Sequence, residues 1–169
     1  TAASGTYNFS NVSILNSTAG SSSISDGILL SDLSGATNFA NLTLNIADTN
    51  AFGISATNAG TVNIGGTSTI QTGSATAASI RIYDDGSGGT TTPDFDLISV
   101  ISGNPLLDPQ TAPDYTAISL ISATAGEINI SSVFTVPDPA TGNPTAGTTS
   151  NVQNPSAVLV RVGGAQISP

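Results

Sequence analysis

Residues 41–83 read NLTLNIADTNAFGISATNAGTVNIGGTSTIQTGSATAASIRIY, and this stretch decides the fold. It contains three pairs of aliphatic residues, each pair flanking one other residue: Leu42/Leu44, Val62/Ile64 and Ile80/Ile82. An apolar residue at every second position is the period of a β-strand with one buried face. The pattern continues at Ile98/Val100 and Ile118/Leu120 and returns at Val158, Val160 and Val162.

The pairs recur at a nearly constant interval. From the pair at Leu42 to the pair at Ile118, successive pairs lie 20, 18, 18 and 20 residues apart. Such a repeat is typical of a solenoid, in which each coil buries its apolar face only against its neighbours. The sequence therefore predicts an all-β protein, a parallel β-helix with coils of about 18–20 residues. An antiparallel, pilin-like β-sandwich is the alternative, in which each repeat is a hairpin.

We expect a single all-β domain over residues 1–169, because this length can bury its own core. No window shows a convincing helical period, although Ile24–Leu33 is compatible with one helical turn. Loop insertions are predicted at 84–96, 103–114 and 137–155, which are rich in Gly or Pro. The predicted strands are Tyr7–Leu15, Asn41–Ile46, Phe52–Ala56, Thr61–Ile64, Ser68–Thr72, Ser79–Tyr83, Leu97–Ile101, Ala117–Ile121, Glu127–Ser131, Val133–Val136 and Ala157–Val162.

Charge and hydropathy together exclude two classes of partner. Only 8% of residues are charged, the net charge is −9, and the only cations are Arg81 and Arg161. Nucleic-acid binding needs clusters of Lys and Arg that replace counterions, so we expect no nucleic-acid partner. No apolar run approaches about 18 residues, so we expect no membrane insertion.

Composition points to a secreted or surface protein. Lys is absent, Ser, Thr, Asn and Gly are abundant, and the chain is acidic, whereas the lack of Cys says little about the compartment. The sequence starts at Thr1-Ala2-Ala3 without Met, which is compatible with a removed signal peptide and equally with a fragment. We expect an extracellular location at a cell surface.

The stretch 42–83 resembles the passenger region of bacterial autotransporter and haemagglutinin-type surface proteins. The resemblance lies in Thr49-Asn50-Ala51-Phe52-Gly53-Ile54, in Ala59-Gly60-Thr61-Val62-Asn63-Ile64-Gly65-Gly66 and in Ser68-Thr69-Ile70-Gln71-Thr72-Gly73. It covers about a quarter of the chain. It implies a right-handed parallel β-helix displayed outside the cell, often as an adhesin.

The residue types leave little chemistry. The chain has no His, Cys or Lys, so it lacks the usual activated nucleophiles and zinc ligands, and we expect no enzyme. A carboxylate-based glycan-processing enzyme is the least favoured hypothesis. The densest acidic cluster is Asp84, Asp85, Asp94 and Asp96, which is a candidate Ca²⁺ site if the loop folds back on itself. A solvated acidic loop is the simpler interpretation, and no other cofactor is expected.

Two surface features of the sequence bear on binding. Sequons for glycosylation occur at Asn8, Asn11, Asn16, Asn41 and Asn129, a number that chance explains in a chain this rich in Asn, Ser and Thr. An ice-binding face is hinted at by Thr61, Thr67, Thr69 and Thr72. Such a face needs Thr at the same rank in several coils, but the residues between the apolar pairs are Thr43, Asn63, Arg81, Ser99 and Ser119.

The favoured hypothesis is a non-catalytic structural or adhesive module of an extracellular surface protein or fibre. Its partners would be copies of itself or neighbouring repeats of a longer surface protein, and a host or surface glycan or protein. The alternative is a self-assembling extracellular filament subunit joined by donated terminal strands, because Tyr7–Leu15 and Ala157–Val162 are apolar and alternating. An ice- or glycan-binding module is less favoured.

Overall fold

The computed structural model describes residues 4–17, 26–46, 51–73, 78–87, 89–102, 118–123, 125–137, 144–146, 152–153 and 157–167. In these residues there is no helix, and the strands form two sheets. The long sheet contains β1 (Thr6–Ser17), β3 (Ala36–Ile46), β5 (Gly60–Thr72), β7 (Thr91–Ser102), β9 (Glu127–Pro137), β10 (Pro144–Ala146), β12 (Leu159–Val162) and β13 (Ala165–Ile167). The short sheet contains β2 (Ile28–Ser31), β4 (Ile54–Thr57), β6 (Ile80–Tyr83), β8 (Ile118–Ile121) and β11 (Val152–Gln153).

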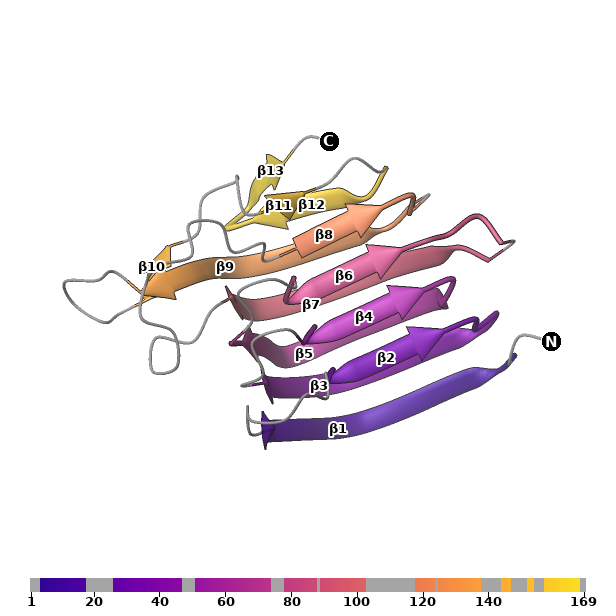
Figure 1. The fold of residues 1–169 in the computed structure, drawn as a ribbon, viewed down its shortest axis with the longest axis horizontal. Helices are drawn as coiled ribbons and strands as arrows, with labels where there is room; N and C mark the ends of the chain where they lie inside the picture. The colour runs from indigo at the N-terminus through magenta and orange to yellow at the C-terminus, as the bar shows by residue number, and fades with distance from the viewer. Residues whose placement is uncertain are drawn as a thin grey trace.

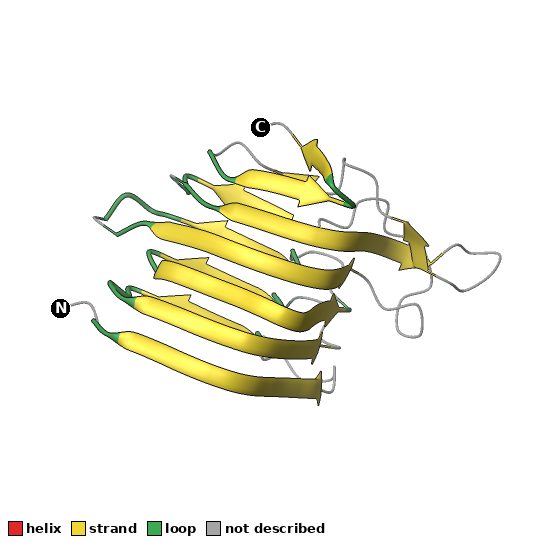
Figure 2. Ribbon diagram, turned by 180° about the vertical axis from the view of Figure 1, so that it is seen from behind, coloured by secondary structure: helices red, strands yellow, loops and turns green. Residues whose placement is uncertain are grey.

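The two sheets face each other and the chain alternates between them. Neighbouring strands pair in parallel from β1 to β12 and from β2 to β11, so the sandwich alternative is wrong. In Figure 1 the short-sheet strands lie in front and run left to right, and the long-sheet strands run back behind them while the coils rise. Figure 2 shows the long sheet from its own side. The chain is therefore a right-handed parallel β-helix, as predicted.

The coils are longer than the sequence interval suggested. Side chains that bond between adjacent coils are 25 residues apart for Asn38 and Asn63, and 33 apart for Asp96 and Asn129. The interval of about 18–20 residues fails because each coil holds an apolar pair on each sheet. From Val62/Ile64 on β5 to Ile80/Ile82 on β6 and onward, the interval measures the step from one sheet to the other. The first interval joins different positions of two neighbouring long-sheet strands, because Leu42/Leu44 lies on β3 and Leu44 pairs with Ile70.

The core consists of apolar rows that run along the stack between the sheets. One row of register partners is Leu44, Ile70 and Val100 on the long sheet, and another is Ile54, Ile80 and Ile118 on the short sheet. All six side chains are at most 1% exposed. Burying one such side chain contributes about 1.5–3 kcal/mol, but only when a coil lies above and below it.

Nine of the ten predicted inward residues of the five pairs are buried, and Ile98 is the exception with 45% exposure. In the pairing of β5 with β7, Ser68 lies opposite Leu97 and Thr69 opposite Ser99, so Ile98 has no opposite residue. This is a β-bulge, which turns a side chain outward at a local irregularity. Leu97 and Val100 fill the core in its place, with 4% and 0% exposure.

The predicted insertions differ from the observed loops. The acidic stretch 84–96 is shorter, because β7 begins at Thr91 and leaves only 84–90 between the strands. The stretch 103–114 lies outside the described residues. Within 137–155, β10 pairs antiparallel with β9 and β11 pairs with β8, so this stretch contributes a strand to each sheet.

We predict that Ile82→Asp destabilises the protein by about 3–5 kcal/mol, because it buries an unpaired charge between the sheets. Ile98→Asp is the matched control and should cost about 1 kcal/mol or less, because the bulge turns that side chain toward solvent. Urea denaturation of both variants measures the difference. Equal losses of stability would contradict the register described here.

Candidate functional site

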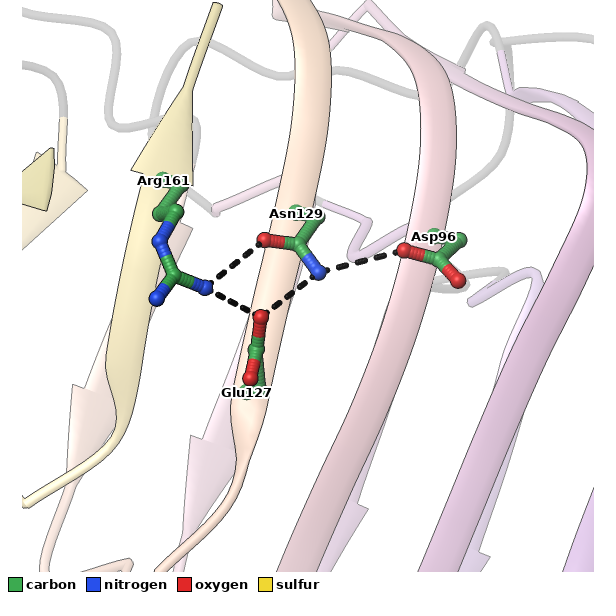
Figure 3. Close-up of polar contacts among 4 residues, drawn as sticks. All are labelled: Asp96, Glu127, Asn129 and Arg161. Carbon is green, nitrogen blue, oxygen red and sulfur yellow. Dashed lines mark hydrogen bonds and ion pairs between the residues drawn. The ribbon is translucent and has the colours of Figure 1, made fainter. Parts of the chain in front are cut away.

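A cavity of about 390 Å³ opens on the outer face of the long sheet, near its C-terminal end. We call it the Arg161 pocket. Its polar wall comes from one residue on each of three adjacent strands: Asp96 on β7, Asn129 on β9 and Arg161 on β12. Figure 3 shows these side chains side by side, with Glu127 of β9 next to them. The remaining lining residues are Gly66, Leu97, Ile98, Ile130, Ser131, Gly163 and Gly164.

The polar wall is a connected hydrogen-bond network. Asn129 Nδ2 donates to Asp96 Oδ1 at 3.2 Å and to Glu127 Oε1 at 2.9 Å. Arg161 Nη1 donates to Glu127 Oε1 in an ion pair, and to Asn129 Oδ1 at 3.4 Å. Arg161 and Glu127 keep 37% and 41% of their side chains exposed. Donors and acceptors are thus held in place while still accessible.

The rest of the pocket lining includes an exposed apolar side chain and a glycine turn. Ile98, the bulged residue of β7, presents its aliphatic side chain there. Gly163 and Gly164 form the two-residue turn between β12 and β13, with φ of +57° and +83°. Positive φ at both central residues is the requirement of a type I′ hairpin turn, which glycine meets without strain. With no side chains on the turn, this end of the pocket stays clear.

Sequence reasoning identified only part of this site. Asp96 was assigned to a metal cluster and Asn129 to a sequon, and neither Glu127 nor Arg161 was singled out. The signal that could have identified the site is the spacing, because Asp96, Asn129 and Arg161 follow each other at intervals of 33 and 32 residues. These intervals equal one coil, so only the correct coil length brings the three residues together.

The four aspartates of the predicted Ca²⁺ site are used differently. Asp84 is buried, and its carboxylate accepts hydrogen bonds from Asn58 N at 3.1 Å, Thr91 N at 2.8 Å and Thr91 Oγ1 at 2.7 Å. Asp94 and Asp96 lie exposed along β7. In the described part of the chain, no three acidic side chains come together in a way that could hold a metal ion. The structure therefore does not assemble the predicted calcium site.

Asp84 and Asp85 belong instead to a corner that joins successive coils. Asn58 is 2% exposed and has φ of +49°, a conformation that Asn tolerates better than most residues. Its Nδ2 donates to Asp85 Oδ1 at 2.9 Å, to Ser87 Oγ at 3.0 Å and to Asp32 Oδ1 at 3.4 Å. Each of these partners lies in an adjacent coil, so the corner ties three coils together.

The sequon asparagines lie largely in amide ladders. Asn11 and Asn41 are register partners on β1 and β3, and Asn41 Nδ2 donates to Asn11 Oδ1 at 3.1 Å. Asn8 Oδ1 likewise accepts from Asn38 Nδ2 at 2.6 Å. The side chain of Asn16 lies outside the described part of the structure. Asn41 and Asn129 thus already use the amide nitrogen to which a glycan would be attached.

The threonines proposed for ice binding do not share one face. Thr72 is buried against Ser79, whereas Thr61 is exposed. One outward row does carry hydroxyls in four successive long-sheet strands, namely Ser13, Thr43, Thr69 and Ser99. The next outward row contains Leu15, Asn45, Gln71 and Ile101. Paired threonine rows are therefore absent from the described residues.

Comparisons with known proteins do not assign the chain to a family. No protein family, curated protein or solved structure matches it. Among the described residues, no helix has the length and hydropathy needed to cross a membrane.

Hydrogen bonds from the Ser87 side chain, the Asn58 amide and the Ser87 backbone lower the pKa of Asp85 from 3.8 to about 2. Because the folded pKa lies below the unfolded value, the ionised carboxylate stabilises the folded state above about pH 4. This stabilisation is lost as the pH falls through about 2. A ¹³C NMR titration of the side-chain carboxyl should show this low pKa.

Ser87→Ala should move the pKa of Asp85 toward its ordinary value, because it removes the largest cause of the shift. Thr43→Ala changes an exposed residue of β3 that has no part in the corner network; it is the control and should leave the pKa of Asp85 unchanged. An ordinary pKa for Asp85 in the unmodified protein would contradict the corner network.

Proposed function

We propose that this chain is a non-catalytic structural and adhesive module of an extracellular surface protein or fibre, with the Arg161 pocket as its contact for a neutral surface glycan. The observation that carries this proposal is the chemistry of the pocket wall. Asp96 and Glu127 accept hydrogen bonds, Asn129 both donates and accepts, and Arg161 donates. Sugar hydroxyls need both kinds of partner, because each donates one hydrogen bond and accepts others.

The apolar side of the pocket fits the same ligand. A pyranose ring has a C–H face as well as hydroxyl edges, and the exposed aliphatic side chain of Ile98 lines the same pocket as the polar wall. Pockets that bind small ligands combine such apolar contact with a few placed polar groups. The site stands on adjacent strands of a stacked sheet, so little ordering is needed on binding.

The charges of the pocket favour a neutral sugar over an acidic one. Arg161 is already paired with Glu127, and Asp96 adds a further negative charge beside them. An anionic sugar would have to approach an uncompensated carboxylate within a chain of net charge −9. Composition supports the extracellular setting, since Lys is absent, Ser, Thr, Asn and Gly are abundant, and the chain is acidic.

A glycan array followed by affinity measurement on the best neutral ligand tests this proposal. Asp96→Ala should weaken binding by about tenfold or more, because it removes a charged acceptor from the wall. Asp94→Ala is the matched control: it removes an equally exposed carboxylate from the same strand, two residues away, outside the pocket. Binding should be unchanged in that variant.

Two outcomes would contradict the proposal. If Asp96→Ala and Asp94→Ala bind the glycan equally well, the Arg161 pocket is not the contact. If the bound glycan is cleaved and cleavage is lost in Glu127→Gln, the pair Asp96 and Glu127 acts as acid and base, and the module is an enzyme.

A second candidate function, assembly into a filament, is favoured by one observation at the N-terminal end of the stack. In the described part of the chain, β1 pairs only with β3, and its other edge has no partner. The strand carries no charge, and Phe9 and Leu15 are 44% and 64% exposed. Uncharged open edges recruit further strands. The opposite end differs, because the long sheet finishes there with the short antiparallel strands β10 and β13.

Phe9→Lys should therefore reduce concentration-dependent association, because it places a charge in the apolar row at the open edge. The expected change is about tenfold in the association constant, measured by sedimentation velocity over a range of concentrations. Thr61→Lys adds the same charge at an exposed position inside the stack and is the control. A protein that stays monomeric at every concentration would exclude the filament.

A further inference from the structure

Arg81, the second of the two cations, lies in the middle of the short sheet and points outward from β6. Its neighbours along the strand, Ile80 and Ile82, are 0% exposed and face the core, whereas Arg81 and Tyr83 are half-buried on the outer face. This face is turned toward the viewer in Figure 1. The Arg161 pocket lies on the other sheet, so the two cations serve different surfaces.

The guanidinium group of Arg81 is held by aromatic rings and not by an acid. Its Cζ lies 5.2 Å from the centroid of the Phe52 ring and 4.9 Å from that of Tyr83. Its one polar contact in the described residues is Nη1 to Ser55 Oγ at 3.5 Å. The ion-pair distances of the described residues include no carboxylate on Arg81, in contrast to Arg161. Within the described residues, the planar donor fork thus has one long polar contact and no carboxylate partner.

Aliphatic side chains border this group along the stack. Leu29 lies in the same row, one strand beyond Ser55, and is 65% exposed. On the other side, Ile121 is the register partner of Tyr83 and is 39% exposed. Ser55 lies between Leu29 and Arg81 in this row and is 2% exposed. An arginine with tyrosine and aliphatic neighbours is the composition of a protein-binding hot spot.

We propose that this surface, which we call the Arg81 face, binds an acidic peptide segment of another protein, with a carboxylate on Arg81 and apolar side chains over Leu29 and Ile121. The guanidinium, which pairs with no carboxylate of the described residues, provides the charge complementarity, since it can hold a carboxylate through two parallel hydrogen bonds. The aliphatic rim favours a peptide over a sugar, because Leu29 and Ile121 offer hydroxyl groups no partner.

The test uses the full chain and an acetylated, amidated peptide with one glutamate between two leucines, so that the glutamate is its only charge. Binding is followed by fluorescence anisotropy. Arg81→Gln should weaken binding by about tenfold or more, and so should a peptide with glutamine in place of glutamate. Arg161→Gln removes the same charge from the other sheet and should leave the affinity within about twofold. Arg81→Lys should recover only part of the loss, because it keeps the charge without the fork.

An NMR titration of the unmodified protein keeps the test independent of how the variants fold. Amide shifts caused by the peptide should concentrate around Arg81, Tyr83 and Ile121. Equal binding of the glutamate and glutamine peptides, or shifts confined to the long sheet, would overturn the proposal. It also fails if free glucuronate binds in an Arg81-dependent manner while the peptide does not, because the partner is then an acidic sugar.

Discussion

The fold depends on the in-register stacking of one coil on the next. A single coil cannot bury its own apolar side chains, because it contributes one strand to each sheet and one residue to each row. Ile70, for example, is covered by Leu44 on one side and Val100 on the other. Parallel strands lie about 4.8 Å apart, so every inward side chain rests on its register partners. The 0% exposure of Ile70, Ile80 and Ile118 follows from this arrangement. The stacking also makes the outer faces of the two sheets regular, and the candidate sites lie on those faces.

The same register gathers polar groups from distant parts of the sequence. The Arg161 pocket draws on three coils, and the Asn58 corner ties Asp32, Asn58 and Asp85 across three coils as well. The two cations have opposite environments, one paired with a carboxylate and the other lying against aromatic rings. We therefore infer that the long sheet and the short sheet present different chemistry to different partners.

Much of the fold was predictable from the alternating apolar pairs, because alternation reports which residues face inward without any knowledge of neighbours. The prediction that Ile98 points inward was wrong, because a bulge depends on how the strand pairs with its neighbour. The strand Ile28–Ser31 was missed because Ile28, Leu29 and Leu30 are consecutive and show no alternation. The Arg161 pocket was not predictable without the coil length, and Asp84 looked like a metal ligand because its partners Asn58 and Thr91 become neighbours only on folding.

Methyl–methyl nuclear Overhauser contacts test the stacking most directly. In-register stacking predicts contacts between register partners of adjacent coils, from Ile14 to Leu44, from Leu44 to Ile70 and from Ile70 to Val100. It predicts none between Ile14 and Ile70, which are separated by a whole strand, about 10 Å. Contacts that instead link Leu42 to Val62 and Leu44 to Ile64 would indicate coils of about 20 residues. Such a pattern would contradict the register on which both proposed sites depend.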